Sequence, residues 1–171
     1  MSQLEQAVTV ACPLAQAGMR LRRFFQDHGN REGNTAKLTL AIELDIPGVP
    51  TPLTLKRTVV ATIQAHHLPA DMEPRYRVQW APEVPGPFPM FAGELVVESA
   101  DDYDSFGLRL IGAYSPPLGL VGQAFDQAMG NHIARAAAGD LLRRIKDLIE
   151  RDFQADEAAK GFAVHDVPSD G

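Results

Sequence analysis

Arg57 is the polar residue that most directly suggests chemistry in this sequence. It lies in the stretch Leu53 to Ala65, where apolar residues such as Leu55 and Val59 alternate as in a strand with one buried face. This alternation puts Arg57 on the apolar face. A guanidinium removed from water needs a carboxylate or an anionic ligand group beside it. The pattern suggests an anchor for an acidic, otherwise apolar ligand; the simpler interpretation is a twist of the strand that takes Arg57 to solvent or to a structural Asp.

Aromatic residues are the second set of candidates, because small-molecule pockets are mostly apolar and Tyr and Trp add a polar group. Core packing is the simpler role for any one of them. Small residues towards the C-terminus have side chains that occupy little volume, which allows either a close approach of helix and sheet or an unfilled space. The aromatic candidates are Tyr76, Trp80, Phe91, Phe106, Tyr114 and Phe125, and the small residues include Gly112, Gly122, Ala124, Ala128, Gly130 and the run Ala136 to Gly139.

Catalytic motifs are missing from the sequence. It has no Gly-x-Ser-x-Gly, no phosphate-binding glycine loop, no His-x-x-x-His and no cysteine pair, so we expect no metal and no cofactor. His132 could act as a general base with Tyr114 or Asp126. A partly buried, hydrogen-bonded histidine is the more ordinary role. His132 and Asp126 are therefore weak catalytic candidates.

Apolar periodicity predicts the elements that position these residues. Alternation at every second position predicts strands over 3–12, 37–46, 53–65, 75–80, 91–98 and 106–114. Pro13 opens a predicted helix over 13–27. After Pro116-Pro117 a stripe at helical spacing, starting from Phe125, predicts one long helix from about 120 to 153. We expect one domain over 1–154 and a frayed or disordered tail over 155–171.

The composition is that of an ordinary globular protein, with 45% hydrophobic and 22% charged residues in a chain of 171. A net charge of -6 disfavours nucleic acid or an anionic membrane surface as the main partner. The single cysteine, Cys12, fits a reducing compartment and a structural thiol. Without a signal-peptide pattern or a membrane-length apolar run, we expect a cytoplasmic protein with no membrane insertion. The cluster Arg20, Arg22 and Arg23 indicates a solvated helix face.

The predicted order of strand, helix, antiparallel strands and one long C-terminal helix resembles the helix-grip order of the START-like (SRPBCC) superfamily. That superfamily includes birch-pollen-allergen-like proteins, bacterial polyketide cyclases and lipid-transfer domains. The segment FPMFAGELVVES, followed by LRLIGAYSPPLGLVGQAFDQAMGNHIARAAAGDLLRRI, looks like uncharacterised bacterial SRPBCC proteins with a Tyr-x-Pro-Pro-x-Gly turn before the long helix. The topological match covers roughly 3–153, and the local match covers about 88–145.

The resemblance implies an α+β helix-grip fold, in which an antiparallel six- to seven-stranded sheet curls around the C-terminal helix and leaves an apolar cavity between them. The wall residues that it implies are Phe91, Tyr114, Phe125, Met129 and Ile133. The sequence departs from larger members in showing six strong strand signals where seven are usual. The region between the first predicted helix and Lys37 is also brief, so we expect the usual second short helix to be abbreviated.

We expect a module that binds a hydrophobic small molecule or lipid, rather than an enzyme. Entry is expected near the proline-rich loop 82–89 and the turn 115–119. The predicted ligand-binding residues are Arg57, Tyr76, Trp80, Phe91, Tyr114, Phe125, Met129 and Ile133. Two alternatives stay open: a cyclase, dehydratase or hydrolase on the same fold, and a protein-interaction module with a filled core. A homodimer is compatible with all three.

Overall fold

The structure is a computed structural model, and it describes residues 2–28, 35–44, 50–51, 53–65, 74–84, 88–115 and 127–163. Its elements are, in chain order, β1 (Ser2–Val10), α1 (Leu14–His28), β2 (Thr35–Leu44), β3 (Leu53–Ala65), β4 (Arg75–Pro82), β5 (Met90–Ser99), β6 (Phe106–Ser115) and α2 (Gln127–Ala163). The predicted first strand ends two residues early, since Cys12 N–H donates to Val10 O (2.9 Å) and turns the chain into α1.

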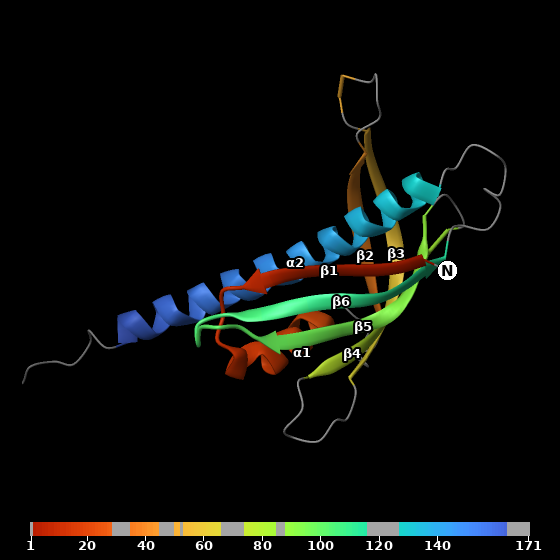
Figure 1. The fold of residues 1–171 in the computed structure, drawn as a ribbon. Helices are drawn as coiled ribbons and strands as arrows, with labels where there is room; N and C mark the ends of the chain where they lie inside the picture. The colour runs from red at the N-terminus through yellow and green to blue at the C-terminus, as the bar shows by residue number, and fades with distance from the viewer. Residues whose placement is uncertain are drawn as a thin grey trace, which may run out of the picture.

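The six strands form one antiparallel sheet in the order β1-β6-β5-β4-β3-β2 (Figure 1). Strands β2 to β6 follow one another as a meander, and β1 then pairs with β6. The edge strands are therefore β1 and β2, and α2 contacts both of them. One helix can contact both edges only because the sheet curls around it. The predicted α+β fold, with an antiparallel sheet of six strands curled around a long C-terminal helix, is confirmed.

The concave face of the sheet carries the core, as the alternation in the sequence predicted. In β6 the residues Phe106, Leu108, Leu110 and Tyr114 are all buried, and Gly112 leaves a gap in that series. In β4 the residues Tyr76, Val78 and Trp80 are buried, whereas the alternate residues are exposed. The register places these positions side by side across the sheet, so each transverse row on the concave face combines residues from distant parts of the chain.

Helix α2 is longer than its apolar stripe. The prediction of a frayed or disordered tail is wrong for residues 155–163, because α2 continues to Ala163. Residues 154–161 are exposed, so burial does not hold these turns in place. Alanines of high helix propensity and the pair of Lys160 Nζ and Glu157 Oε1 (2.7 Å) favour the helix locally. Asp156 adds a tertiary contact, an ion pair with Arg20 of α1. Residues 164–171 lie outside the described part.

Polar contacts join the middle of α2 to the turn between β1 and α1. Glu150 Oε1 accepts a hydrogen bond from Ala11 N–H (2.7 Å). Lys146 Nζ donates to Thr9 O (2.7 Å) and to Glu150 Oε1 (2.5 Å). Desolvation by itself would raise the pKa of Glu150. The hydrogen bond from Ala11 N–H and the charge of the Lys146 ammonium lower that pKa by more than desolvation raises it, so the pKa lies below its usual value. The contact therefore favours the ionised carboxylate.

This contact predicts acid-dependent stability. Because the folded pKa of Glu150 is depressed, its stabilisation is present above the unfolded-state pKa and is lost as pH falls through the folded value. A Glu150→Gln variant keeps an acceptor for Ala11 but loses the charge. We expect it to be less stable than the wild type by about 1 kcal/mol near neutral pH, and the difference to shrink below about pH 4. Urea unfolding across this pH range measures it; a constant difference would contradict the assignment.

Candidate functional site

The concave face holds an aromatic row beneath the start of α2. The register pairs Tyr114 with Phe91, Phe91 with Trp80, and Trp80 with Ala61, so the row crosses four adjacent strands. The rings of Trp80 and Phe91 are stacked, with centroids 4.2 Å apart and an interplanar angle of 18°. Tyr114 is 2% exposed, and Phe91 and Trp80 are 3% exposed each. Three of the predicted ligand-binding residues are thus brought together, and they are packed rather than open to solvent.

A pair of glycines gives the Phe91 ring its position. Gly93 and Gly112 face each other across β5 and β6, in the transverse row next to the aromatic one. A Cβ added to Gly112 would lie 2.7 Å from Phe91 Cζ, and one added to Gly93 would lie 2.6 Å from the same atom. Both distances are shorter than a van der Waals contact. The phenylalanine ring therefore lies over the glycine pair, in space that any other residue would fill.

Small residues of α2 lie over this part of the sheet. The Cβ position of Gly130 is 4.0 Å from Tyr114 Cε2. Ile133, one turn further on, is 3% exposed. Ala134, Ala137 and Ala138 are at most 1% exposed. These small residues near the start of α2 thus belong to a close packing of the helix against the core.

Two hydrogen-bond donors in side chains on the concave face of the sheet lack an acceptor. Trp80 Nε1 and Arg57 Nε are both buried, and neither has a hydrogen-bond partner in the described structure. A buried donor without a partner costs about 1–3 kcal/mol. Such groups therefore call for a functional explanation in a way that satisfied polar groups do not.

Arg57 lies on the face that the sequence predicted. It pairs with Leu40 of β2, and it shares the parity of the buried Val59 and Ala61 along β3. Arg57 itself is half-buried. Because it is four residues from Ala61 along β3, its Cα lies about 13 Å beyond the aromatic row, towards the hairpin that joins β2 and β3. Strand twist does not carry Arg57 to the convex face.

Tyr76, another predicted ligand-binding residue, lies at the opposite end of β4. Its ring makes an edge contact with Phe25 of α1, with centroids 5.8 Å apart. Burial raises the pKa of the Tyr76 hydroxyl, and Arg22 lowers it only in part. Tyr76 is thus packed under α1, whereas Trp80 belongs to the row under α2.

The other predicted site residues divide between the described part and the rest. Phe125 and Asp126 lie outside the described residues, as does the side chain of Met129. His132 is exposed, although the adjacent Ile133 is buried. Neighbouring residues of a helix point about 100° apart, so burial of one leaves the other free to face solvent. Among the described residues no hydrogen bond joins the exposed His132 to the buried Tyr114, and the suggested acid–base pair of His132 with Tyr114 or Asp126 stays a prediction.

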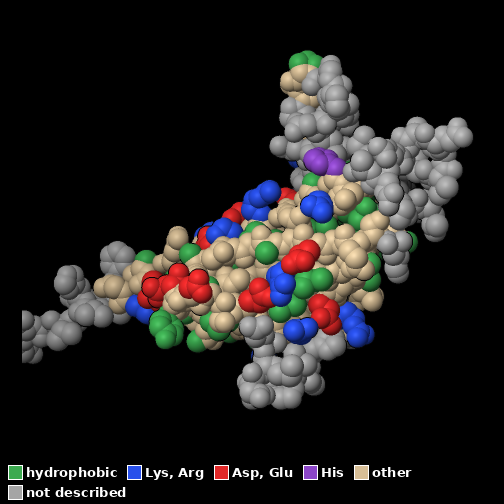
Figure 2. Space-filling model, in the orientation of Figure 1, with side chains coloured by type: hydrophobic (Ala, Val, Ile, Leu, Met, Phe, Trp, Pro, Cys, Tyr) green, Lys and Arg blue, Asp and Glu red, His purple; other side chains and the backbone are tan. Residues whose placement is uncertain are grey.

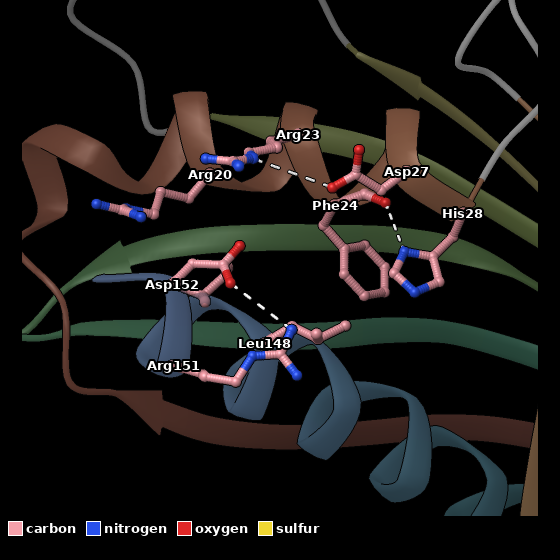
Figure 3. Close-up of a pocket in the computed structure, with 9 residues that line it drawn as sticks. Arg20, Arg23, Phe24, Asp27, His28, Leu148, Arg151 and Asp152 are labelled. Atoms are coloured by element: carbon pink, nitrogen blue, oxygen red, sulfur yellow. Dashed lines mark hydrogen bonds and ion pairs between the residues drawn. The ribbon is translucent and has the colours of Figure 1, made fainter. Parts of the chain in front are cut away.

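A hollow of about 260 Å³ lies elsewhere, between α1 and the C-terminal half of α2 (Figure 3). Ile149, Phe24 and Arg20 are its most buried lining residues. Charged side chains of both signs surround them, and the cations have carboxylate partners: Arg23 with Asp27 (4.0 Å), and Arg151 with Asp152 (3.6 Å). Pairing leaves no excess of one charge to select an anion or a cation.

Arg20, at the edge of this hollow, was missed as a structural residue. The cluster of Arg20, Arg22 and Arg23 was predicted to be solvated, which is wrong for Arg20, since it is only 5% exposed. Its Nη2 donates to Gln16 Oε1 (2.8 Å) and pairs with Asp156 Oδ2 (2.9 Å). The signal was present in the sequence, because the buried positions of α1 are Ala17, Arg20, Leu21, Phe24 and Phe25, which recur at helical spacing through Arg20.

Cys12 lies beside Arg20 in the core. The residue is fully buried, and burial raises the pKa of its thiol despite the opposing effect of the Arg20 guanidinium. A raised pKa keeps the thiol protonated at neutral pH and therefore a poor nucleophile.

The convex face of the sheet is polar. Figure 2 shows side chains of both charges interspersed on the side where β1, β6 and β5 are in view. Arg109 of β6 bridges Glu5 of β1 (3.3 Å) and Glu98 of β5. The large apolar side chains that are exposed among the described residues are scattered: Leu14 and Met19 lie on α1, Met90 begins β5, and Val84 and Tyr103 lie in connections.

Within the described ranges, no three His, Cys, Asp or Glu side chains are grouped so that they could hold a metal ion. No helix in this part of the chain is long and apolar enough to cross a membrane.

Comparisons with known proteins bear on the fold alone. No protein-family model matches the sequence, and no curated protein matches it. Among solved structures, a conserved protein from Geobacillus kaustophilus is similar over 88% of this chain and 96% of its own, with a TM-score of 0.53 and 14% identity. A putative uncharacterized protein from Bacillus thuringiensis is similar over 86% and 98%, with a TM-score of 0.52 and 11% identity.

A START superfamily protein from Mycobacterium smegmatis aligns over 90% of this chain and 97% of its own, with a TM-score of 0.47 and 10% identity. The fold is assigned from the architecture itself: a curled antiparallel sheet whose two edge strands both contact one long C-terminal helix. The structures from Geobacillus kaustophilus and Bacillus thuringiensis share this overall fold. The chain therefore has a helix-grip fold, which is the fold that its resemblance to START-like proteins predicted.

Proposed function

We propose that the protein binds a hydrophobic small molecule or lipid between the concave face of the sheet and α2. The observation that carries the proposal is the pair of buried donors without acceptors, Trp80 Nε1 and Arg57 Nε, on a face that is otherwise apolar. A ligand site combines an apolar wall with a few convergent polar groups. An oxygen-bearing apolar ligand would bury the wall and satisfy the donors at once.

The position of Arg57 gives the ligand an orientation. Arg57 is half-buried and lies towards the β2–β3 hairpin, whereas the aromatic row is almost fully buried. An acidic group would pair with the guanidinium near solvent, and the apolar part would lie against Phe91 and Tyr114. Phe125, Met129 and Ile133 of the α2 region are proposed as the facing wall.

Binding requires a change in packing. Trp80, Phe91 and Tyr114 contact their neighbours so closely that a ligand reaches them only when α2 separates from the sheet or the rings change rotamer. The small residues of α2 favour such a movement, because little side-chain interdigitation opposes a shift of the helix.

Two twelve-carbon amphiphiles test the proposal. Dodecanoate and 1-dodecanol would displace the fluorescent probe N-phenyl-1-naphthylamine from the protein, and each displacement gives a dissociation constant. Arg57→Gln removes the charge. It should weaken the binding of dodecanoate about tenfold relative to the binding of 1-dodecanol, since a charge-assisted hydrogen bond is lost. The ratio of the two constants cancels any general effect on the apolar site.

The matched control is Arg77→Gln, the same substitution at an exposed position on the convex face of β4. It should leave the ratio unchanged. Leu148→Trp, which adds bulk in the hollow between α1 and α2, should leave probe binding unchanged. Absence of saturable probe binding, or an equal effect of Arg57→Gln and Arg77→Gln, would refute the proposed site.

A further inference from the structure

Trp80 is the single tryptophan of the chain, and it is the more deeply buried of the two concave-face residues that carry a donor without an acceptor. The third such donor among the described residues, Arg109 Nε, lies on the convex face. The Trp80 side chain is fixed on both sides by the sheet register, with Ala61 of β3 beside it and the stacked Phe91 ring of β5 on the other side. The ring plane is thus set by packing, and packing alone does not require a nitrogen in that ring.

Tryptophan is an unfavourable choice for this position if its role is only to fill space. Buried tryptophans normally pair their N–H with an acceptor, because the unpaired donor loses its hydrogen bond to water. Phenylalanine, already used at the stacked position 91, would provide an apolar ring without that penalty. The penalty disappears when an acceptor oxygen enters the site.

Arg57 does not supply the same recognition. Its Cα lies about 13 Å along β3 from the row that contains Trp80. It is half-buried, whereas Trp80 is 3% exposed. A guanidinium selects an anion near solvent, and an indole N–H in an apolar surrounding selects a neutral acceptor.

We infer that the ligand carries a neutral carbonyl-type oxygen within its apolar body, and that Trp80 Nε1 donates a hydrogen bond to it. This inference rests on the proposed function and narrows its ligand class from apolar compounds in general to ketones, esters or amides of largely apolar structure. Trp80 is thereby a specificity-determining residue, which discriminates against hydrocarbons of the same shape.

A matched pair of compounds separates this inference from the proposed function. The probes are 2-acetylnaphthalene and 2-ethylnaphthalene, which have nearly the same shape and differ by the carbonyl oxygen. In protein labelled with ¹⁵N, the one indole N–H signal is that of Trp80. The ketone should move the indole proton to lower field than the hydrocarbon does, because only the ketone accepts a hydrogen bond. Subtracting one shift from the other removes the common ring-current effect of the naphthalene.

The variant Trp80→Phe keeps an aromatic ring in the stack and removes only the donor. It should raise the dissociation constant of 2-acetylnaphthalene about tenfold more than that of 2-ethylnaphthalene, both measured by probe displacement. The NMR comparison needs no substitution, so the inference stays testable if Trp80→Phe folds poorly. Equal indole shifts with both compounds, while both bind, would overturn the inference and leave the proposed function standing. If the naphthylamine probe binds saturably but neither naphthalene compound displaces it, the inference alone is overturned. If the probe itself does not bind saturably, the proposed function fails and the inference falls with it.

Discussion

Replacing Gly112 by alanine is expected to destabilise the protein by about 2–3 kcal/mol. The new Cβ would lie 2.4 Å from Ala92 O and 2.6 Å from Gly93 Cα, and both of these atoms belong to the backbone of the neighbouring strand. Backbone atoms in a paired strand cannot yield without loss of ladder hydrogen bonds. The Phe91 ring, 2.7 Å from the same position, would also have to leave the glycine pair.

The control for Gly112→Ala is Gly107→Ala, the same change on the same strand. A Cβ at Gly107 meets nothing closer than Glu98 Cβ at 3.5 Å, which is ordinary contact. Stability should change by less than about 0.5–1 kcal/mol, and in the stabilising direction. Urea unfolding followed by Trp80 fluorescence measures both variants, and it also reports the stack of Trp80 on Phe91. Similar midpoints for the two variants would show that the close approach of β5 and β6 does not constrain residue 112.

The second large effect is expected at Arg20. Arg20→Ala removes the hydrogen bonds to Gln16, the ion pair with Asp156 and the stacking on Phe153, whose ring centroid is 5.5 Å from the guanidinium carbon. We expect a loss of about 2 kcal/mol, mostly from packing and the bonds to Gln16, because the side chain of Asp156 is 51% exposed and solvent screens the ion pair. Amides of residues 157–163 should also exchange faster, since this contact ties the end of α2 to α1.

Arg20→Lys distinguishes geometry from charge. Lysine keeps the positive charge but lacks the planar fork that reaches Gln16 and Asp156 together, so most of the loss should persist. Arg23→Ala, at a position on α1 with a 61% exposed side chain, is the control, and it should change stability by less than about 0.5 kcal/mol. Unchanged exchange at residues 157–163 in Arg20→Ala would refute the role of Arg20 in holding the end of α2.

The strands could be predicted from the sequence because one face of the sheet is buried and the other faces solvent. Burial of alternate residues leaves a period of two, which is visible in Tyr76, Val78 and Trp80. The same reasoning placed Arg57 on the concave face, and the register confirms that placement. The end of α2 was predicted too early because residues 155–163 have no apolar stripe, and periodicity detects only helices that bury one face.

The candidate site was predictable only in part, because side chains meet there from strands far apart in the chain. The sequence contained Tyr114, Phe91 and Trp80 as separate aromatics, and nothing in their spacing indicated that they form one row. Nor could spacing reveal that Tyr76 belongs under α1. His132 is exposed for a local reason. It lies one position from the buried stripe of α2, and one position on a helix changes the direction of a side chain by about 100°.

The sequence alone determined the order of elements, the face of each strand and the presence of a cation among apolar neighbours, since these follow from local periodicity. The tertiary structure decided which of those residues adjoin and which polar atoms lack partners. Register between strands sets both, and register depends on pairings such as that of Gly93 with Gly112, which no local pattern encodes. The buried N–H of Trp80 is therefore a property of the fold rather than of the residue.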